Sequence, residues 1–434
     1  MSSSLNKIGW LTAASLVIAN MIGTGVFTSL GFQLVNTTNT YSIILLWSLG
    51  AIMALCGALS YSELGTLLKR SGGEYHFLSE LYHPFVGYLS GWVSLTVGFA
   101  APIALAAIAL GKYTSVYIPI SESVIAVSVV IIVTIVHLFS IKQSSKFQDI
   151  ATFFKVALIV GFIIIGLSIS ETPNALDFSN SWTSEVQSTA FAVSLIYVSY
   201  SYSGWNASAY IVDEIRNVRK NLPKALLVGT LVVSVLYILL QIVFLKSAPL
   251  HLLSGKVEVG QVAATQLYGE LGGTLLSTFI ALMLISSISA MVWVGSRVSK
   301  TIGEDYKLWK FLGKTSKNKI PVNALWIQLG VTILLILTGT FEIILVYSGI
   351  LLQVFVTLSV IGVFIMRRKY DNQDAFKTPL YPIPQIIFLL ISAWIIIYLS
   401  IEQPMEYLIG AGILSIGAIT YFINKKMKNN ENTI

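Results

Sequence analysis

The sequence predicts an all-α membrane protein with twelve transmembrane helices. Its composition, its apolar windows and the placement of its basic residues each point to that fold. Hydrophobic residues make up 55% of the 434 positions and charged residues only 11%, with a mean hydropathy of +0.79. Because soluble domains carry about 25% charged residues, this composition excludes an ordinary soluble protein.

Apolar windows of about 20 residues, the length that crosses a bilayer, recur along the whole chain. No soluble domain stands between them, so we expect residues 1–434 to form a single transmembrane domain. The shortest turn separates the ninth and tenth windows, near Thr340. The predicted spans are residues 10–34, 41–65, 85–111, 121–140, 148–169, 186–212, 224–247, 266–296, 323–340, 342–366, 380–399 and 405–424.

The basic residues follow the loops of one side. With the N-terminus in the cytoplasm, only Lys112, Lys246 and Lys256 of the 27 lysines and arginines fall in outside loops, and Lys155 falls within a span. Cytoplasmic loops of membrane proteins carry such an excess of Lys and Arg. The distribution predicts that both termini are cytoplasmic. It also attributes the net charge of +7 to topology, so we expect contact with membrane lipid and not with nucleic acid.

The first and sixth spans are interrupted by residues that weaken a helix. Gly23, Thr24 and Gly25 lie within the first, and a glycine costs a helix about 1 kcal/mol relative to alanine. Close packing of neighbouring helices explains isolated glycines in membranes, but it fits two glycines so close together less well. The sixth span reads IYVSYSYSGWNASAY over residues 196–210, with a polar centre of Ser199, Ser201, Ser203 and Gly204.

The two interrupted spans run in opposite directions, because five spans separate their starting points. Paired broken helices in two halves of a chain are the sequence sign of an inverted-repeat transporter. Unwinding frees N–H groups that suit a carboxylate and C=O groups that suit an ammonium, provided that these groups line a cavity. The pattern therefore predicts a site for the zwitterionic head of an amino acid.

Other function classes find less support in the residues. The motifs HExxH, GxSxG and the Walker loop are absent, so we expect no enzyme. Cys56 is the single cysteine and the four histidines are scattered, which predicts neither a metal site nor a cofactor. A channel or a membrane receptor stays an alternative, but a channel needs a continuous pore. No acidic residue lies in the middle of spans one, three, six or eight, so we expect a neutral substrate.

The chain resembles a known family along nearly its whole length. It is similar to the amino acid–polyamine–organocation (APC) transporters, and most closely to their L-type amino acid transporter (LAT) branch, bacterial type. The stretches that carry the resemblance are MIGTGVF, YSELGTLLKRSGGEYHFLSELYHPFVGYLSGW (61–92), SYSGWNASAYIVDEIRNVRKNLPKAL (201–226), GSRVSKTIGED (295–305), IPVNAL and RRKYDNQDAFKTPLYPIP (367–384).

The resemblance implies a LeuT-like fold of five-plus-five inverted repeats with discontinuous helices 1 and 6. Repeat one would cover about 10–169, repeat two about 186–366, and two extra helices about 380–424. By position, the substrate carboxylate would bind the backbone of Ile22, Gly23, Thr24 and Gly25. The amine and side chain would contact Tyr200, a candidate gating aromatic residue, Ser201, Tyr202, Ser203 and Gly204, with Trp205 and Asn206 in support. The family often has Gly where this chain has Ser203.

Lys155 lies in the fifth span, about 10 Å from its cytoplasmic end at about 1.5 Å per residue. It is either a lysine that snorkels to the interface or a functional intramembrane cation. The resemblance implies the second: a lysine that replaces a bound sodium ion and bridges span one to spans five and eight, with Ser286, Ser287 and Ser289 as candidate neighbours. We therefore expect sodium-independent transport.

Two modes of transport stay open at this stage. The LAT-like stretches favour an amino acid exchanger, and the intramembrane lysine is also compatible with proton symport. Eukaryotic LAT members bind a partner glycoprotein through an external cysteine, and the loop 112–120 has none, so we expect no disulfide-linked heavy chain. The compact termini are typical of a bacterial protein, which predicts the plasma (cell inner) membrane.

Overall fold

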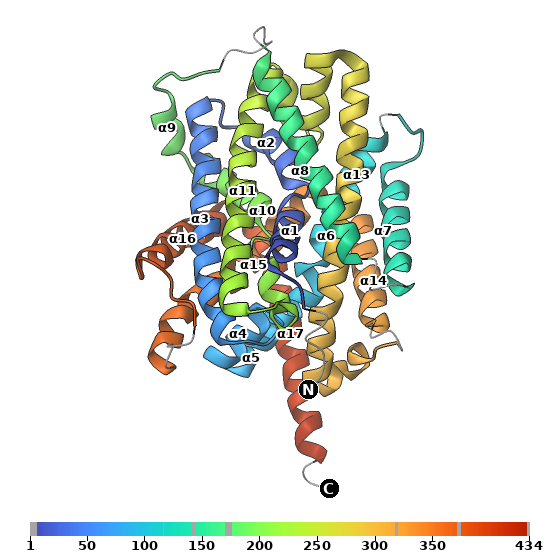
Figure 1. Ribbon diagram of the computed structural model, residues 1–434, viewed down its shortest axis with the longest axis vertical. Coiled ribbons are helices and arrows are strands. Elements are labelled where there is room, and N and C mark those ends of the chain that lie inside the picture. The colour runs from blue at the N-terminus through green and yellow to red at the C-terminus, as the bar shows by residue number, and fades with distance from the viewer. Residues whose placement is uncertain are drawn as a thin grey trace.

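Every named element in the described ranges of the chain is a helix. The computed structural model describes residues 7–115, 117–139, 144–169, 176–316, 320–370 and 375–431. Long helices such as α3, α11 and α13 stand side by side over the height of the molecule, and α17 extends beyond the bundle at one end (Figure 1). The ends of the chain at 1–6 and 432–434 lie outside the described residues, and their side of the membrane stays a prediction.

The helices follow the predicted spans in order. Their bounds are α1 Trp10–Met21, α2 Gly25–Gln33, α3 Thr40–Leu67, α4 Glu74–Leu81, α5 Pro84–Val93, η2 Ser94–Gly98, α6 Ala100–Ser115, α7 Glu122–Phe139, α8 Ser144–Ser168, α9 Trp182–Val186, α10 Thr189–Tyr202, η3 Ala207–Glu214, α11 Val218–Ser247, α12 Leu250–Leu253, α13 Val259–Asp305, η4 Lys307–Gly313, α14 Val322–Thr338, α15 Phe341–Lys369, α16 Ile383–Glu402 and α17 Pro404–Glu431.

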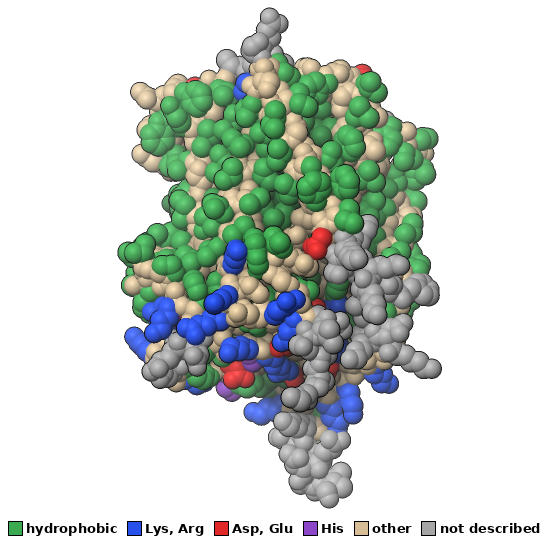
Figure 2. All heavy atoms as spheres, in the orientation of Figure 1, with side chains coloured by type: hydrophobic (Ala, Val, Ile, Leu, Met, Phe, Trp, Pro, Cys, Tyr) green, Lys and Arg blue, Asp and Glu red, His purple; other side chains and the backbone are tan. Residues whose placement is uncertain are grey.

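The helical architecture and the apolar surface agree with a membrane protein. Eight helices of the described chain are long and apolar enough to cross a bilayer, and three shorter apolar helices accompany them, Glu122–Leu138, Thr152–Ser168 and Val322–Thr338. Hydrophobic side chains cover most of the face seen in Figure 2, and Lys and Arg gather at its lower end. The count of twelve crossings and the inverted repeat stay predictions.

Local sequence signals explain several helix ends. The side chain of Asn39 accepts a hydrogen bond from the backbone of Tyr41 at the start of α3, and Ser188 caps α10 in the same way. Thr340 caps α15 and so forms the short turn after α14. Such caps satisfy N–H groups that have no partner inside the helix.

The helix α13 is longer than the sequence suggested. We expected the eighth span to end at residue 296, but the chain stays helical to Asp305. In its last turns Val298 and Ile302 pack with Leu312 of η4 and Tyr75 of α4 in a small apolar cluster, and Arg297 pairs with Glu214. Amphipathic packing of the last turns therefore overrides the charged composition that predicted a loop.

The first predicted break is present between α1 and α2. Helix α1 ends at Met21 and α2 begins at Gly25, with Ile22 in a non-helical conformation at φ −74° and ψ 82°. The second break follows Tyr202, where Gly204 takes a φ of +98° that favours glycine. The chain then continues as the 3₁₀ helix η3.

The two breaks lie against each other in antiparallel order. A Cβ built on Gly25 would lie 2.5 Å from the Cα of Ser201. A Cβ built on Gly204 would lie 2.8 Å from the carbonyl carbon of Asn20. Residue 25 thus faces 201 while residue 20 faces 204, so the two segments of the chain run in opposite directions where they touch.

We predict that Gly25→Ala lowers the melting temperature of the purified protein. The added methyl group would collide with the backbone of Ser201, and overpacking of this kind costs about 1–3 kcal/mol. The matched control is Gly161→Ala in α8, where a Cβ meets no atom within 4 Å and the helix gains propensity. An unchanged melting temperature for Gly25→Ala would contradict the close approach of the two breaks.

Candidate substrate-binding site

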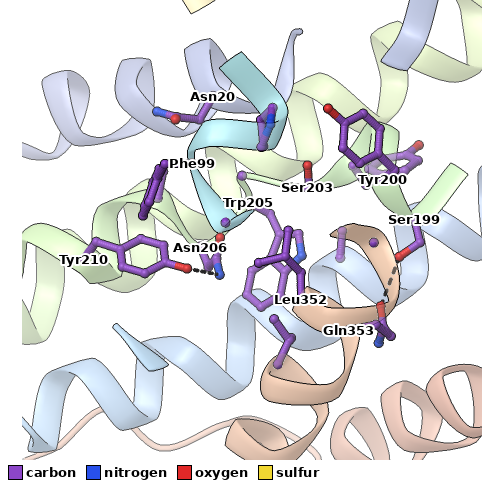
Figure 3. A pocket seen from close by; sticks show the side chains of 18 of the residues that line it. Asn20, Phe99, Ser199, Tyr200, Ser203, Trp205, Asn206, Tyr210, Leu352 and Gln353 are labelled. Atoms are coloured by element: carbon purple, nitrogen blue, oxygen red, sulfur yellow. Dashed lines mark hydrogen bonds between the residues drawn. The ribbon is translucent and has the colours of Figure 1, made fainter. Parts of the chain in front are cut away.

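A cavity of about 110 Å³ lies beside the second break. One water molecule needs about 10–15 Å³, so the cavity is large enough for a small solute. Figure 3 shows Tyr200, Ser203, Trp205 and Asn206 of the second break around the cavity, together with Asn20 of α1. Tyr202 and Gly204 complete the contribution of the break to the lining.

The first break contributes less to this cavity than its sequence suggested. Of the first span, Asn20 lines the cavity, whereas Ile22, Gly23, Thr24 and Gly25 do not belong to the lining. Ile22 and Thr24 are buried, and the hydroxyl of Tyr200 interacts with Thr24. Tyr200 therefore lines the cavity and also contacts the first break at Thr24.

Ser201 is also turned away from the cavity. Its hydroxyl donates to the carbonyl oxygen of Tyr197 at 2.7 Å and lies 2.8 Å from the hydroxyl of Ser29 in α2. Ser29 in turn donates to the carbonyl oxygen of Tyr197 at 3.2 Å. The Ser201 side chain thus ties α10 to α2 and holds the two broken spans together.

The backbone of the first break presents donors on one side. Within the described chain, the N–H groups of Thr24, Gly25 and Val26 form no backbone hydrogen bond, and no side chain caps α2. These groups stand at the N-terminus of a helix, where the dipole favours negative charge. The arrangement is suited to a carboxylate that displaces Tyr200 from Thr24.

The carbonyl groups that α1 frees at its C-terminal end are bound by side chains. The ammonium of Lys155 in α8 donates to the carbonyl oxygen of Ile22 at 2.8 Å and to that of Ala19 at 3.3 Å. The hydroxyl of Tyr237 in α11 donates to the carbonyl oxygen of Met21 at 2.5 Å. The freed acceptors are therefore satisfied inside the protein, as buried backbone groups require.

Lys155 is fully buried and connects three helices. Besides α1, its ammonium donates to the hydroxyl of Ser287 in α13 at 2.8 Å, and Ser287 donates to the carbonyl oxygen of Ile22 at 2.9 Å. A positive charge at the C-terminal end of α1 is favoured by the helix dipole. The side chain lies where a bound cation could otherwise satisfy the same carbonyl groups.

The other two candidate serines have different surroundings. The hydroxyl of Ser289 lies 2.9 Å from Nε2 of His137 in α7. The hydroxyl of Ser286 is buried and has no hydrogen-bond partner among the described residues. Of the three serines, Ser287 is the one that contacts Lys155.

Some cavity residues were missed by the sequence analysis. Ser199 donates to Oε1 of Gln353 at 3.1 Å (Figure 3). Nε2 of Gln353 donates to Ser392 in α16 at 2.9 Å. Gln353 and Asn20 are amides within apolar spans, and that isolated polarity is the signal that could have found them. Phe99 and Met291 add apolar walls, which carry no such signal.

The supporting residues Trp205 and Asn206 differ in their contacts. The ring of Trp205 packs edge-on against Tyr61, with 4.8 Å between ring centroids. Nδ2 of Asn206 donates to the carboxylate of Glu74 at 2.7 Å. None of the residues that line the cavity in the described chain carries a charged side chain.

Known proteins similar to this chain are amino acid transporters. The mouse b(0,+)-type amino acid transporter 1 is 28% identical, over 97% of this chain and 88% of its own length. The serine/threonine exchanger of Bacillus subtilis (strain 168) is 27% identical, over 97% of both chains. The human cystine/glutamate transporter is 26% identical, over 96% of this chain and 85% of its own length.

A family model agrees with these relatives. The model described as amino acid permease matches residues 8–421, which include both broken spans and every residue of the cavity. The chain therefore belongs to the amino acid permease family, within the APC superfamily that its motifs resemble.

Proposed function

We propose that the protein is a sodium-independent secondary transporter that exchanges neutral L-amino acids by alternating access. Ten of twelve transmembrane helices would form five-plus-five inverted repeats, and two extra helices would follow. The site would be exposed alternately to the two sides of the plasma membrane, with both termini in the cytoplasm. The antiparallel contact of the two breaks supports the inverted repeat, because residue 25 faces 201 while 20 faces 204.

The observation that carries the proposal is the environment of Lys155. Its ammonium group donates to the carbonyl oxygens of Ile22 and Ala19. A sodium ion at this place would compete with a charge that is already covalently attached. The contacts support transport that needs no sodium gradient.

The cavity supports a neutral substrate. Its described lining combines aromatic and apolar walls with hydroxyl and amide groups, and it holds no charged side chain. A cationic or anionic side chain would lose its hydration there without a counter-charge, which is costly. The N–H groups of Thr24 and Gly25 would receive the carboxylate, and the carbonyl groups at the end of α10 would receive the amine.

Exchange is the mode that the relatives favour, since the Bacillus subtilis relative is named as a serine/threonine exchanger. Proton-coupled symport is the alternative, because a buried lysine can also take part in proton movement. We expect no disulfide-linked heavy chain, since Cys56 is buried within α3.

Uptake into proteoliposomes tests the proposal. Vesicles preloaded with a neutral amino acid should accumulate the labelled compound rapidly, and empty vesicles should not, with sodium and with potassium buffers alike. Strong uptake into empty vesicles under a pH gradient would favour symport instead. Uptake that requires sodium would refute the assignment of Lys155.

A competition panel is expected to separate substrate classes. Neutral L-amino acids should compete with the labelled substrate and raise the melting temperature, since a ligand that binds the native state stabilises it. Arginine, lysine and glutamate should do neither, because the cavity offers no counter-charge. Stabilisation by charged amino acids alone would contradict the neutral assignment.

We predict that Lys155→Ala reduces exchange at least about tenfold. It leaves the buried carbonyl group of Ala19 without its donor, at about 1–3 kcal/mol, and leaves that of Ile22 with Ser287 as its remaining donor. The control is Lys112→Ala, which removes a partly exposed lysine 3.7 Å from Glu122 and should leave exchange unchanged. Exchange at the wild-type rate across a range of pH in Lys155→Ala would exclude this role.

A further inference from the structure

A buried carboxylate, that of Glu74, lies next to the cavity residue Asn206. Glu74 is the first residue of α4, between the predicted second and third spans, and is 4% exposed. The loop before it packs on the broken sixth span: the N–H of Gly72 donates to the carbonyl oxygen of Tyr210, and a Cβ on Gly73 would lie 2.4 Å from the Tyr210 ring.

Glu74 stands close in the sequence to Lys69 and Arg70, but its carboxylate does not bind Arg70. Arg70 binds Asp305 at 2.8 Å, and Glu63 binds Arg367 at 2.6 Å. Within the described ranges, Glu74 forms no ion pair with any basic side chain. Its charge is therefore stabilised by neutral donors alone.

Those donors come from two different elements. The hydroxyl of Tyr61 in α3 and Nδ2 of Asn206 each donate to Oε1 of Glu74 at 2.7 Å. The hydroxyl of Tyr210 also interacts with the carboxylate and lies 3.4 Å from Nδ2 of Asn206. Asn206 and Tyr210 line the cavity (Figure 3) and belong to the cytoplasmic half of the broken sixth span.

Burial raises the pKa of Glu74 above its ordinary value, while the hydrogen bonds from Tyr210, Tyr61 and Asn206 act in the opposite direction. Loss of the donors from the sixth span while the carboxyl group stays buried would raise the pKa further. Uptake of a proton and the contact with Asn206 and Tyr210 therefore oppose each other, as linkage requires.

Other titratable groups near Glu74 are neutral or bound elsewhere. Tyr61 of α3 and Tyr210 of η3 are the titratable groups that face the carboxylate. Burial lowers the pKa of His76 on the same helix, which favours its neutral form. Charged groups of the packed elements form the pairs Glu63–Arg367, Arg70–Asp305 and Glu214–Arg297. Asp213 binds Ser71, and Lys369 donates to the carbonyl oxygen of Glu80.

We propose that Glu74 is a proton-binding site that controls the position of the cytoplasmic half of the broken sixth span. The ionised carboxylate holds Asn206 and Tyr210 against the loop at 72–74. The protonated carboxyl group loses the charge that makes these hydrogen bonds strong, so the half-helix is freed to move. The proposal rests on the transport function, since a moving sixth span matters only in alternating access.

The test is exchange of a neutral amino acid in proteoliposomes at equal pH on both sides. We expect the wild-type rate to rise about threefold or more as the pH falls from about 8 to about 5, because the ionised form restrains the half-helix. Glu74→Gln, which imitates the protonated form, should exchange at the fast rate throughout this range. Glu80→Gln, on the exposed side of the same helix, should keep the wild-type profile.

Tyr61→Phe is a second variant that leaves Glu74 in place. The variant removes a hydrogen-bond donor to the carboxylate that comes from α3 and not from the sixth span. Loss of this donor raises the pKa of Glu74, so the midpoint of the pH profile should move upward by about one pH unit. Infrared difference spectra of the wild type should show a carboxyl band that forms on acidification with the same midpoint, and Tyr61→Phe should move both together. This variant tests the proposal even if Glu74→Gln fails to fold.

A pH profile of Glu74→Gln that matches the wild type would overturn the proposal, as would an unmoved midpoint in Tyr61→Phe. These outcomes differ from failure of the transport function itself. If that function is wrong, the wild-type protein shows no exchange at any pH.

Discussion

The structure depends on one constraint: a helix broken within a membrane must find partners for the backbone groups that it frees. The first span meets it with Lys155, Ser287 and Tyr237, which bind the carbonyl groups at the end of α1. These side chains come from α8, α13 and α11. Three separate helices therefore fix the position of the break, and a movement of any of them would change the geometry of the site.

The donors on the other side of the break have a different role. The N–H groups of Thr24 and Gly25 stay without backbone partners in the described chain, and Tyr200 lies beside them. Unpaired donors near a cavity provide binding energy to a ligand that can accept from them. Under the proposed function, the asymmetry between bound carbonyl groups and open N–H groups would orient an amino acid by its carboxylate. At the second break, the carboxylate of Glu74 accepts a hydrogen bond from Asn206, which precedes the half-helix η3.

Residue chemistry and spacing predicted the breaks, because two glycines in the first span and serines around Gly204 in the sixth weaken helices wherever they stand. They could not predict side-chain direction. Ser201 and Ser203 are two positions apart, yet Ser203 lines the cavity while Ser201 binds Ser29. In the same way Ser287 meets Lys155 and Ser289 meets His137, since the direction of each side chain depends on how α13 packs. The helical end of α13 was missed because tertiary packing, and not composition, stabilises it.

The most direct test is an experimental structure of the protein with a saturating neutral L-amino acid. The account predicts that the substrate carboxylate lies within hydrogen-bonding distance of the N–H groups of Thr24 and Gly25, that Tyr200 has moved from Thr24, and that Lys155 keeps its contact with Ile22. An amino acid bound with its carboxylate away from the first break, or a sodium ion between Ile22 and Ser287, would contradict it.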